Sequence, residues 1–202
     1  MTTIDSARLV AMFTTIADRI DGERDRLCAL DGVIGDADHG IAMSGGFGAV
    51  REALAGLDMS ACDPTAVFNT AAKSFLNAVG ASSGPLYATA FMRAGASVKG
   101  KAALDRMDFL GAFQAMAKGI QDRGKAEIGE KTMIAAWAPA AQAAQAAQGP
   151  SLAAALDAAL AAAESGAEAT KQMVAAKGRA SRLGERALGH MDPGAASAVI
   201  VI

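Results

Sequence analysis

Three aspartates, Asp31, Asp36 and Asp38, stand within a ten-residue segment that also contains three glycines. The segment spans residues 31–40 and precedes an apolar pattern with helical spacing. Carboxylates this close together repel one another, and some must hold protons unless a cation compensates their charge. Mg²⁺ suits this role, because it prefers oxygen ligands and aspartate presents them on a short side chain. We therefore interpret residues 31–40 as a candidate metal site.

Gly40 and the helix expected behind it add an anion-binding element. A glycine lets the backbone approach a bound anion, and the first N–H groups of a helix have no partner within it. Metal ligands followed directly by such a helix start predict a metal–phosphate site. His39 could act here as a general base, a metal ligand or a phosphate donor. Metal ligation by His39 is disfavoured, because the adjacent carboxylates are better ligands for Mg²⁺.

Three further glycine-rich breaks carry related chemistry, at residues 82–85, 123–133 and 178–194. They combine hydroxyl groups, small residues, and Arg or Lys beside Asp, which are the parts of a phosphate cradle. Any one of them could also be an ordinary loop between helices. Alternate loops of an antiparallel bundle lie at the same end, so the four breaks can converge. Two near matches to the P-loop, at 95–102 and 119–126, lack the Ser or Thr and follow no predicted strand, so we reject them.

Helical periodicity dominates the elements that must position these loops. We find no credible strand ladder and no internal repeat. Pro139 predicts a kink or an early position in its helix. The chain is therefore expected to form one all-α domain over residues 1–202, an up-and-down bundle of about eight antiparallel helices. The expected helices span about 4–20, 22–30, 41–57, 64–79, 86–98, 108–123, a stretch opening near 132, 151–176 and 195–202.

Composition narrows the class of protein. Apolar residues make up 52% of the 202 residues but aromatic residues only 4%, and the abundant alanine favours closely packed helices. A net charge of −2 gives no basic surface for nucleic acid. No apolar run is suited to span a membrane and no signal peptide is apparent, so we expect a cytoplasmic protein. Cys28 and Cys62 are expected to be reduced thiols, since a zinc site lacks further ligands.

Taken together, the motifs resemble one family: the L subunit, or nucleotide-binding domain, of dihydroxyacetone kinase. The resemblance runs from about residue 5 to the C-terminus and implies an all-α barrel of eight antiparallel helices with the nucleotide at one end. The motifs that carry it lie at residues 31–40, 82–86, 123–127, 129–133, 178–186 and 189–195.

The resemblance implies that Asp31, Asp36 and Asp38 hold two Mg²⁺ ions that bridge the diphosphate of ADP or ATP. It implies no certain catalytic side chain, because phosphoryl transfer depends chiefly on positioning and charge neutralisation. Two departures stand out: Ala42 replaces a residue that is often polar, so we expect it to contribute only its backbone, and Glu130 replaces the usual aspartate. The residues implied to contact nucleotide are His39, Gly40, Ile41 and Ala42 at the helix start, Ser82 and Ser83 at phosphate oxygens, Gly124 and Met133 beside adenine, Arg179, and Asp192, Pro193 and Gly194 closing the pocket.

By the same resemblance, the chain carries only the nucleotide half of a kinase, whose ketose is bound through a histidine of a separate K subunit. In the phosphotransferase-dependent form, which the short chain favours, bound ADP acts as a coenzyme and a phosphohistidine-bearing M subunit rephosphorylates it. The sequence leaves three alternatives open: the L subunit of an ATP-dependent erythrulose-type kinase, a non-catalytic nucleotide-dependent regulatory module, and a structural helical protein whose aspartates merely cap a helix. The ketose, the phosphoryl donor and the oligomeric state, a homodimer included, also stay open.

Overall fold

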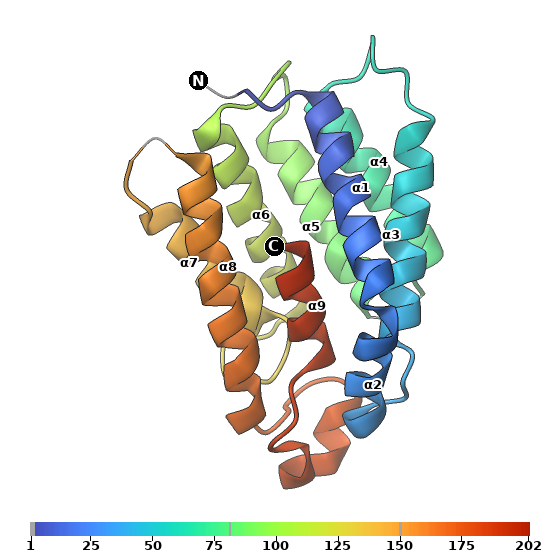
Figure 1. Cartoon of the computed structure of the whole chain (residues 1–202), viewed down its shortest axis with the longest axis vertical. Coiled ribbons are helices and arrows are strands. Elements are labelled where there is room, and N and C mark those ends of the chain that lie inside the picture. The colour runs from blue at the N-terminus through green and yellow to red at the C-terminus, as the bar shows by residue number, and fades with distance from the viewer. Residues whose placement is uncertain (1–2, 81, 150) are drawn as a thin grey trace.

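The computed structural model describes residues 3–80, 82–149 and 151–202, and this part of the chain is built from helices (Figure 1). Ala81 and Pro150, which the sequence places in loops, lie outside the described residues. The only β pairing among the described residues is an isolated bridge between Ile4 and Leu104. The α-helices are α1 (Ser6–Gly22), α2 (Arg24–Ile34), α3 (His39–Ala55), α4 (Pro64–Ala78), α5 (Ser83–Ser97), α6 (Arg106–Gly124), α7 (Ile134–Ala146), α8 (Leu152–Ala169) and α9 (Pro193–Val201), with 3₁₀ helices η1 (Thr170–Gln172) and η2 (Arg179–Ala187).

The long helices run alternately in opposite directions around a barrel. Each of α3 to α8 packs against the next, α1 packs on α3, and the short α9 lies between α8 and α1 (Figure 1). The predicted fold class, an all-α antiparallel bundle, is confirmed. None of the helices in the described ranges is both long and apolar enough to cross a membrane.

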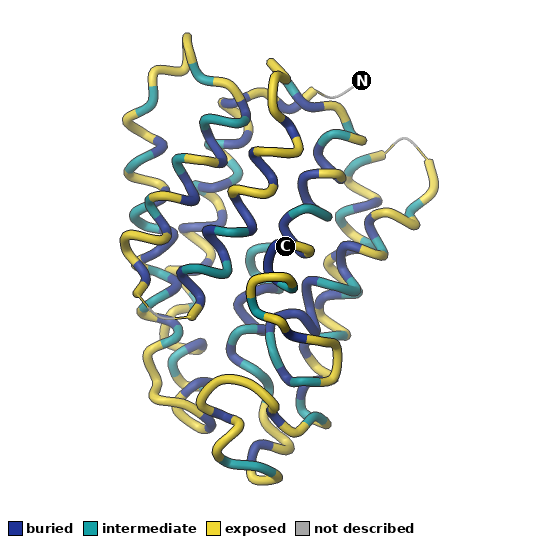
Figure 2. Tube along the Cα trace, turned by 180° about the vertical axis from the view of Figure 1, so that it is seen from behind, coloured by how far each residue is buried: buried dark blue, intermediate teal, exposed yellow. Residues whose placement is uncertain are grey.

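The core lies along the barrel axis, and the buried stripe of each helix faces it (Figure 2). Aromatic rings meet edge to face at its centre, with ring centroids 5.1 Å apart for Phe47 and Phe75 and 5.2 Å apart for Phe13 and Phe91. This geometry brings the positive edge of one ring to the negative face of another. The helical spacing of apolar residues in the sequence therefore predicted the buried faces correctly.

Small residues let α7 and α8 pack closely together. A Cβ on Gly166 of α8 would overlap the carbonyl oxygen of Ala135 in α7. That carbonyl lacks its usual helical donor, because the residue four positions later is Pro139, which has no N–H. Pro139 thus lies inside α7, and the Ala135 carbonyl that it leaves without a helical donor points toward Gly166 of α8. The alanines that line α8 at every fourth position are fully or almost fully buried: Ala155, Ala159, Ala163 and Ala167.

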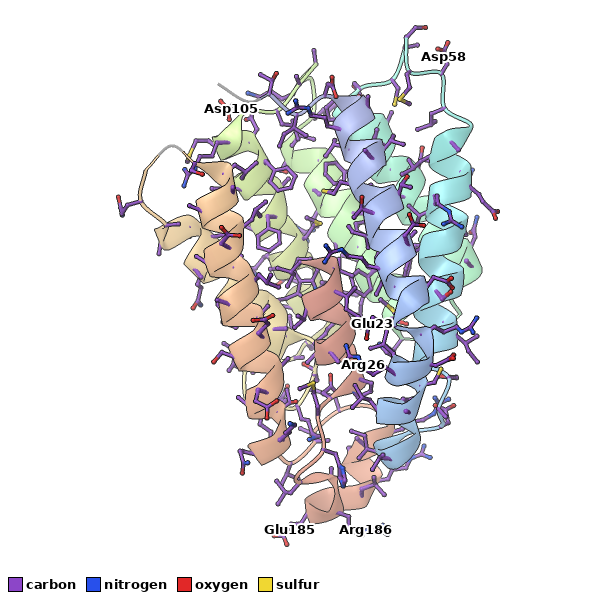
Figure 3. All side chains as sticks on the ribbon, viewed as in Figure 1. Glu23, Arg26, Asp58, Asp105, Glu185 and Arg186 are labelled. Carbon is purple, nitrogen blue, oxygen red and sulfur yellow. The ribbon has the colours of Figure 1, made fainter. Side chains whose placement is uncertain are left out.

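The connections alternate between the two ends of the barrel. Figure 3 places Asp58 and Asp105, from two connections, at one end, and Glu185 and Arg186 at the opposite end. The connections that follow α2, α4, α6 and α8 all join the helices at the end that carries Glu185. These are the four glycine-rich breaks, and their predicted convergence at one end of the bundle is confirmed.

Two helices at this end start or stop differently from the expectation. Helix α2 continues to Ile34 instead of ending at residue 30, because Leu27, Asp31 and Ile34 form one buried face. Asp31 is therefore a helical residue, not part of the loop. Helix α5 begins at Ser83 and not at residue 86, because Pro85 occupies the third helical position, where the missing N–H breaks no helical bond.

The alanine-rich helix α8 is shorter than predicted. The sequence suggested one helix to residue 176, but α8 ends at Ala169 and a 3₁₀ turn follows. Tertiary hydrogen bonds replace the helical ones here: the ammonium group of Lys131 donates to the carbonyl of Thr170, and the N–H of Ala176 donates to the carbonyl of Glu130. The segment expected to be irregular after Gly178 contains η2, and α9 begins at Pro193, two residues earlier than predicted.

Candidate functional site

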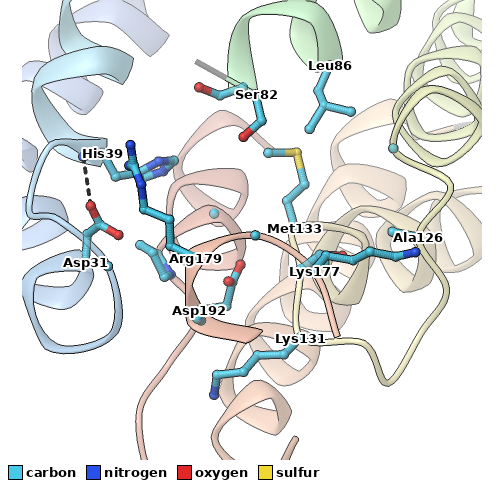
Figure 4. Close-up of a pocket in the computed structure, with 18 of the residues that line it drawn as sticks. Asp31, His39, Ser82, Leu86, Ala126, Lys131, Met133, Lys177, Arg179 and Asp192 are labelled. Carbon is cyan, nitrogen blue, oxygen red and sulfur yellow. Dashed lines mark hydrogen bonds between the residues drawn. The ribbon is translucent and has the colours of Figure 1, made fainter. Parts of the chain in front are cut away.

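A pocket of about 500 Å³ opens at the end of the barrel where the four glycine-rich breaks meet (Figure 4). Its volume lies in the usual range for a small-molecule site. Most of the residues predicted to bind metal or nucleotide line it, and two, Gly40 and Ile41, do not. Those that line it are Asp31, Asp36, Asp38, His39, Ala42, Ser82, Ser83, Gly124, Met133, Arg179, Asp192, Pro193 and Gly194.

The three aspartates form one acidic cluster at the pocket wall. Each presents a carboxylate oxygen within 4.8 Å of the others. Asp31, in the last turn of α2, is only 8% exposed. Its Oδ2 accepts hydrogen bonds from the main-chain N–H groups of Asp38 at 3.0 Å and His39 at 3.3 Å. The aspartate of α2 therefore holds the loop that carries the other two aspartates.

The negative charge of this acidic cluster is only partly compensated within the protein. Burial and the neighbouring carboxylate of Asp36 raise the pKa of Asp38. The guanidinium of Arg179 pairs with Asp36 and lies 3.8 Å from Asp38. Arg179 thus offsets part of the charge that a divalent cation would neutralise. Three closely spaced aspartate oxygens are a suitable donor set for Mg²⁺, so the residues present fit the predicted metal.

The start of α3 differs in detail from the prediction. Asp38 stands at the N-cap position, but its side chain makes no capping hydrogen bond. A Cβ on Gly40 would overlap the carbonyl oxygen of Arg24, so this glycine is required for packing against α2 and does not face the pocket. Ile41 is 63% exposed and lies on the outer side. The N–H of Ala42 donates to the carbonyl of Asp38 within α3, and Ala42 lines the pocket. Its contribution through the backbone stays a prediction.

His39 connects the start of α3 to the opposite wall. Its Nε2 lies 2.8 Å from Oγ of Ser197 in α9. Burial lowers the pKa of His39, which favours the neutral imidazole. His39 is not a member of the metal-capable cluster found among the described residues, which contains the three aspartates.

One side of the pocket is largely apolar. It is lined by Leu86, Ile120, Ala126 and Met133, beside Gly124. A Cβ on Gly124 would come within 3.2 Å of a methyl group of Leu86. Such a surface suits a flat ring with little charge, whereas the three aspartates and Arg179 lie on the opposite wall. Lys177 reaches toward Ala126 at the edge of the apolar surface (Figure 4). The pocket therefore has one side suited to a base and one suited to a metal–phosphate group.

Lys131 is a functional candidate that the sequence reasoning missed. Its side chain is almost fully buried, and its ammonium group donates to the carbonyls of Thr170 and His190. The hydroxyl of Thr170 in turn accepts from the N–H of Asp192 at 2.9 Å. Burial lowers the pKa of Lys131. Lys131 thus joins two of the pocket loops, its own and both ends of the connection at 170–192. The signal in the sequence was a lysine in the middle of the glycine-rich motif at 129–133.

Asp192 begins α9 and lies in the same polar network. Its Oδ2 caps the helix by accepting from the N–H of Ala195 at 2.8 Å. Burial raises the pKa of Asp192 to about 7, against the opposing effects of that hydrogen bond and of the charge of Lys131. The protonation of Asp192 in the ligand-free protein therefore changes near neutral pH.

Comparison with known proteins gives a consistent picture. The model of the DAK2 domain matches residues 33–202. The chain is 38% identical over 201 residues to the ADP-binding subunit DhaL of a PEP-dependent dihydroxyacetone kinase of Escherichia coli (strain K12), covering 98% of this chain and 95% of that protein. It is 34% identical over 199 residues to the ADP-binding subunit DhaL of a PTS-dependent dihydroxyacetone kinase of Lactococcus lactis, covering 98% and 93%.

A solved structure has the same fold. The dihydroxyacetone kinase from C. freundii, in complex with AMP-PNP and Mg²⁺, superimposes with a TM-score of 0.76 at 25% sequence identity. The match covers all of this chain and 34% of that one. The chain therefore spans nearly the full length of the separate subunits and about a third of the larger kinase.

Proposed function

Since the chain belongs to the DAK2-domain family, we propose that it is the nucleotide-binding subunit of a dihydroxyacetone kinase, in which residues 1–202 act as one domain. The observation that carries this proposal is the pocket itself. An acidic cluster suited to Mg²⁺ and an apolar slot suited to a base face one cavity, and residues from all four glycine-rich breaks line it.

In this proposal Asp31, Asp36 and Asp38 hold two Mg²⁺ ions, which neutralise the charge of the diphosphate and of the transferred phosphoryl group. Asp31 also orders the loop through its two main-chain hydrogen bonds. Arg179 exchanges its carboxylate partners for phosphate oxygens when the cations bind. Ser82 and Ser83 stand at the start of α5, where hydroxyl and N–H groups can donate to phosphate.

The adenine lies in the apolar slot between Leu86, Gly124 and Met133. Asp192, Pro193 and Gly194 form the adjoining wall, which Lys131 and Thr170 hold in place. These side chains exclude water from the phosphoryl group and fix its direction. Positioning of this kind is the main contribution a protein makes to phosphoryl transfer.

We further propose the coenzyme mode of action for the cytoplasmic subunit. ADP stays bound, a phosphohistidine-bearing M subunit rephosphorylates it, and the chain passes the phosphoryl group to a ketose on a partner K subunit. The identity of 38% and 34% to the ADP-binding subunits of PEP- and PTS-dependent kinases, over nearly the full length of those subunits, supports this mode.

The test combines a binding and a transfer measurement. Calorimetry of the purified chain with ADP, with and without Mg²⁺, is expected to show Mg²⁺-dependent binding that Asp36→Asn abolishes. Asp58→Asn is the matched control, because Asp58 is an exposed aspartate at the opposite end of the barrel. Absence of Mg²⁺-dependent binding in the wild type would contradict the proposal.

Transfer is measured by adding a K subunit loaded with dihydroxyacetone and either a phosphorylated M subunit or free ATP, and by quantifying the phosphorylated ketose. The coenzyme mode predicts product with the phosphorylated carrier and little with ATP. Product with ATP alone would favour the ATP-dependent alternative, and erythrulose in place of dihydroxyacetone tests the substrate. Nucleotide binding without transfer to either ketose from either donor would support the regulatory alternative.

A further inference from the structure

The connection between α8 and α9, residues 170–192, forms one wall of the pocket with little apolar packing to hold it. Its middle part, from Lys177 to Ala180, lines the pocket (Figure 4). Three buried alanines of this connection pack with Ile34 in a small cluster that is separate from the main core: Ala175, Ala180 and Ala187. A segment with so few buried apolar contacts opens locally at low cost unless polar contacts hold it.

The ammonium group of Lys131 holds the two ends of this connection together. It donates to the carbonyl of Thr170 at 2.7 Å and to the carbonyl of His190. The same ends are joined directly, because the N–H of Gly189 donates to the carbonyl of Lys171 at 2.8 Å. Lys131 is only 2% exposed, so removal of its ammonium group would leave two carbonyls without this donor.

The backbone of Lys131 is also unusual. Its φ of 56° lies in the left-handed region, which residues other than glycine seldom adopt. Such a conformation persists where the surrounding contacts fix it, and it is frequent in segments that clamp a ligand. The loop thus turns sharply at Lys131, and the side chain of this residue points inward to the ends of the 170–192 connection.

Glu130, the preceding residue, holds the middle of the same connection. Its carbonyl accepts from the N–H of Ala176 at 3.1 Å. Its carboxylate accepts from the N–H of Glu127 at 2.8 Å through Oε2, and its Oε1 lies 3.8 Å from Nζ of Lys177. The two neighbouring residues, Glu130 and Lys131, therefore contact the connection at its middle and at both ends.

We propose that Glu130 and Lys131 are positioning residues that clasp the 170–192 connection over the pocket and thereby set how slowly bound nucleotide leaves. Lys131 anchors the ends, and Glu130 holds the middle, where Lys177 faces the pocket. Outward movement of the middle would widen the exit, and this movement breaks the contacts with Glu130. The inference rests on the proposed function, because it concerns the residence time of nucleotide in that pocket. The contacts of the clasp themselves belong to the ligand-free protein.

Hydrogen exchange of the ligand-free protein tests the clasp without any nucleotide. Amide exchange followed by NMR is expected to show that the N–H groups of Ala176 and Gly189 are protected. Lys131→Met should reduce this protection about tenfold, the effect of losing roughly one hydrogen bond. Exchange of both amides at the rate of an open chain in the wild type would overturn the proposal.

Arg106→Met is the matched control for Lys131→Met. Arg106 is also a partly buried cation that donates to a distant main-chain carbonyl, that of Ala147 at 3.0 Å, but it lies at the opposite end of the barrel. The control should leave both amides of the connection protected. An equal loss of their protection in the two variants would contradict a local clasp.

The dissociation rate of Mg–ADP tests the consequence for the pocket. A fluorescent ADP analogue, bound with Mg²⁺, is displaced by excess ADP in a stopped-flow instrument. Lys131→Met should raise the dissociation rate about tenfold without lowering the association rate, and Arg106→Met should change neither. An unchanged dissociation rate, or an affinity loss caused by slower association, would contradict the proposal, since slower association indicates a distorted pocket.

A double-mutant cycle tests the contribution of Glu130. Glu130→Gln keeps an oxygen for the N–H of Glu127 and removes the charge that faces Lys177. It should raise the dissociation rate by up to about fivefold, the effect of an exposed ion pair. In a Lys177→Gln background the same change should have no further effect, because the pair is already broken. An equal effect in both backgrounds would contradict the pairing.

Each part of the proposal stays testable if another experiment fails. If Lys131→Met does not fold, the protection of the wild-type amides and the cycle at Glu130 and Lys177 decide. If the wild type binds no Mg–ADP, the proposed function fails, while hydrogen exchange of the ligand-free protein still tests the clasp.

Discussion

Replacement of Asp38 by alanine separates the metal-site reading of residues 31–40 from the reading in which the aspartates merely cap a helix. Asp38 occupies the N-cap position of α3 but makes no capping hydrogen bond. Asp63 provides the contrast, because it is an exposed aspartate at the N-cap of α4 whose side chain accepts from the N–H of Ala66 at 2.7 Å. The two aspartates share position and exposure and differ in the hydrogen bond.

Without ligand, the two variants should differ in stability. Asp63→Ala loses a true cap and should lower the free energy of unfolding by about 1 kcal/mol. Asp38→Ala has no cap to lose and removes a negative charge beside Asp31 and Asp36. Its exposed ion pair with Arg179 contributes little. The free energy of unfolding of Asp38→Ala should therefore equal or slightly exceed that of the wild type.

With Mg–ADP present, the order should reverse. A ligand at 100 times its dissociation constant stabilises the folded state by about 2.7 kcal/mol. For a chain of this length, that gain raises the melting temperature by roughly 5–10 °C. Asp63→Ala should keep this increase in full. Asp38→Ala should lose it, because one of the three metal ligands is gone.

Thermal unfolding followed by far-ultraviolet circular dichroism measures both effects. Wild type and both variants are melted in buffer alone, with Mg²⁺, with ADP, and with both, at one nucleotide concentration set from the wild-type affinity. A loss of stability in ligand-free Asp38→Ala equal to that of Asp63→Ala would favour the capping interpretation. An undiminished Mg–ADP increase in Asp38→Ala would refute its role as a metal ligand.

Three further predictions follow from the packing and the buried charges. Gly166→Ala should destabilise the protein by about 1–3 kcal/mol, because the new Cβ overlaps the Ala135 carbonyl. Gly111→Ala should stabilise it by about 0.5–1 kcal/mol, because a Cβ at this position of α6 meets open space. Urea unfolding of both variants measures this contrast. Lys131→Met should weaken Mg–ADP binding and cost at least about 1 kcal/mol in urea unfolding, because it removes the donor to two buried carbonyls. The pKa of Asp192 in the folded protein is raised to about 7, so the folded protein keeps a proton that the unfolded chain has lost above about pH 4. The free energy of unfolding of the ligand-free wild type, relative to that of Asp192→Asn, should therefore fall by up to about 1.4 kcal/mol per pH unit between about pH 4 and 7. A difference between the two proteins that stays constant over this range would contradict the raised pKa.

Much of the barrel follows from local sequence patterns. Apolar residues at three- and four-residue steps face the core in α1, α3, α4 and α6, and the helix expected from residue 64 begins at Pro64, after its N-cap Asp63. These patterns involve residues only a few positions apart, so they can be recognised without knowledge of the tertiary contacts. The acidic segment was found for the same reason, because the repulsion among Asp31, Asp36 and Asp38 is already implied by their spacing.

The boundaries at the pocket end could not be predicted, because contacts between distant segments set them. The alanine-rich stretch has helical propensity to residue 176, but α8 ends at Ala169, where the ammonium group of Lys131 donates to the carbonyl of Thr170. Likewise Gly40 resembled a glycine that admits an anion, and the structure shows a glycine required by the carbonyl of Arg24. In both cases the partner is distant in the sequence or on another helix, which a local pattern does not contain.

By itself, then, the sequence determined the class of fold, the metal-ligand candidates and the loops that carry the chemistry, because these depend on residue types at short spacing. Only the tertiary structure decided which residues share the pocket wall, that Asp31 and not Asp38 binds the first N–H groups of α3, and that Lys131 and Ser197 hold the opposite side. The physical reason is that a buried donor or acceptor needs a hydrogen-bond partner, and the packing of the helices into the barrel determines which group lies close enough to be that partner.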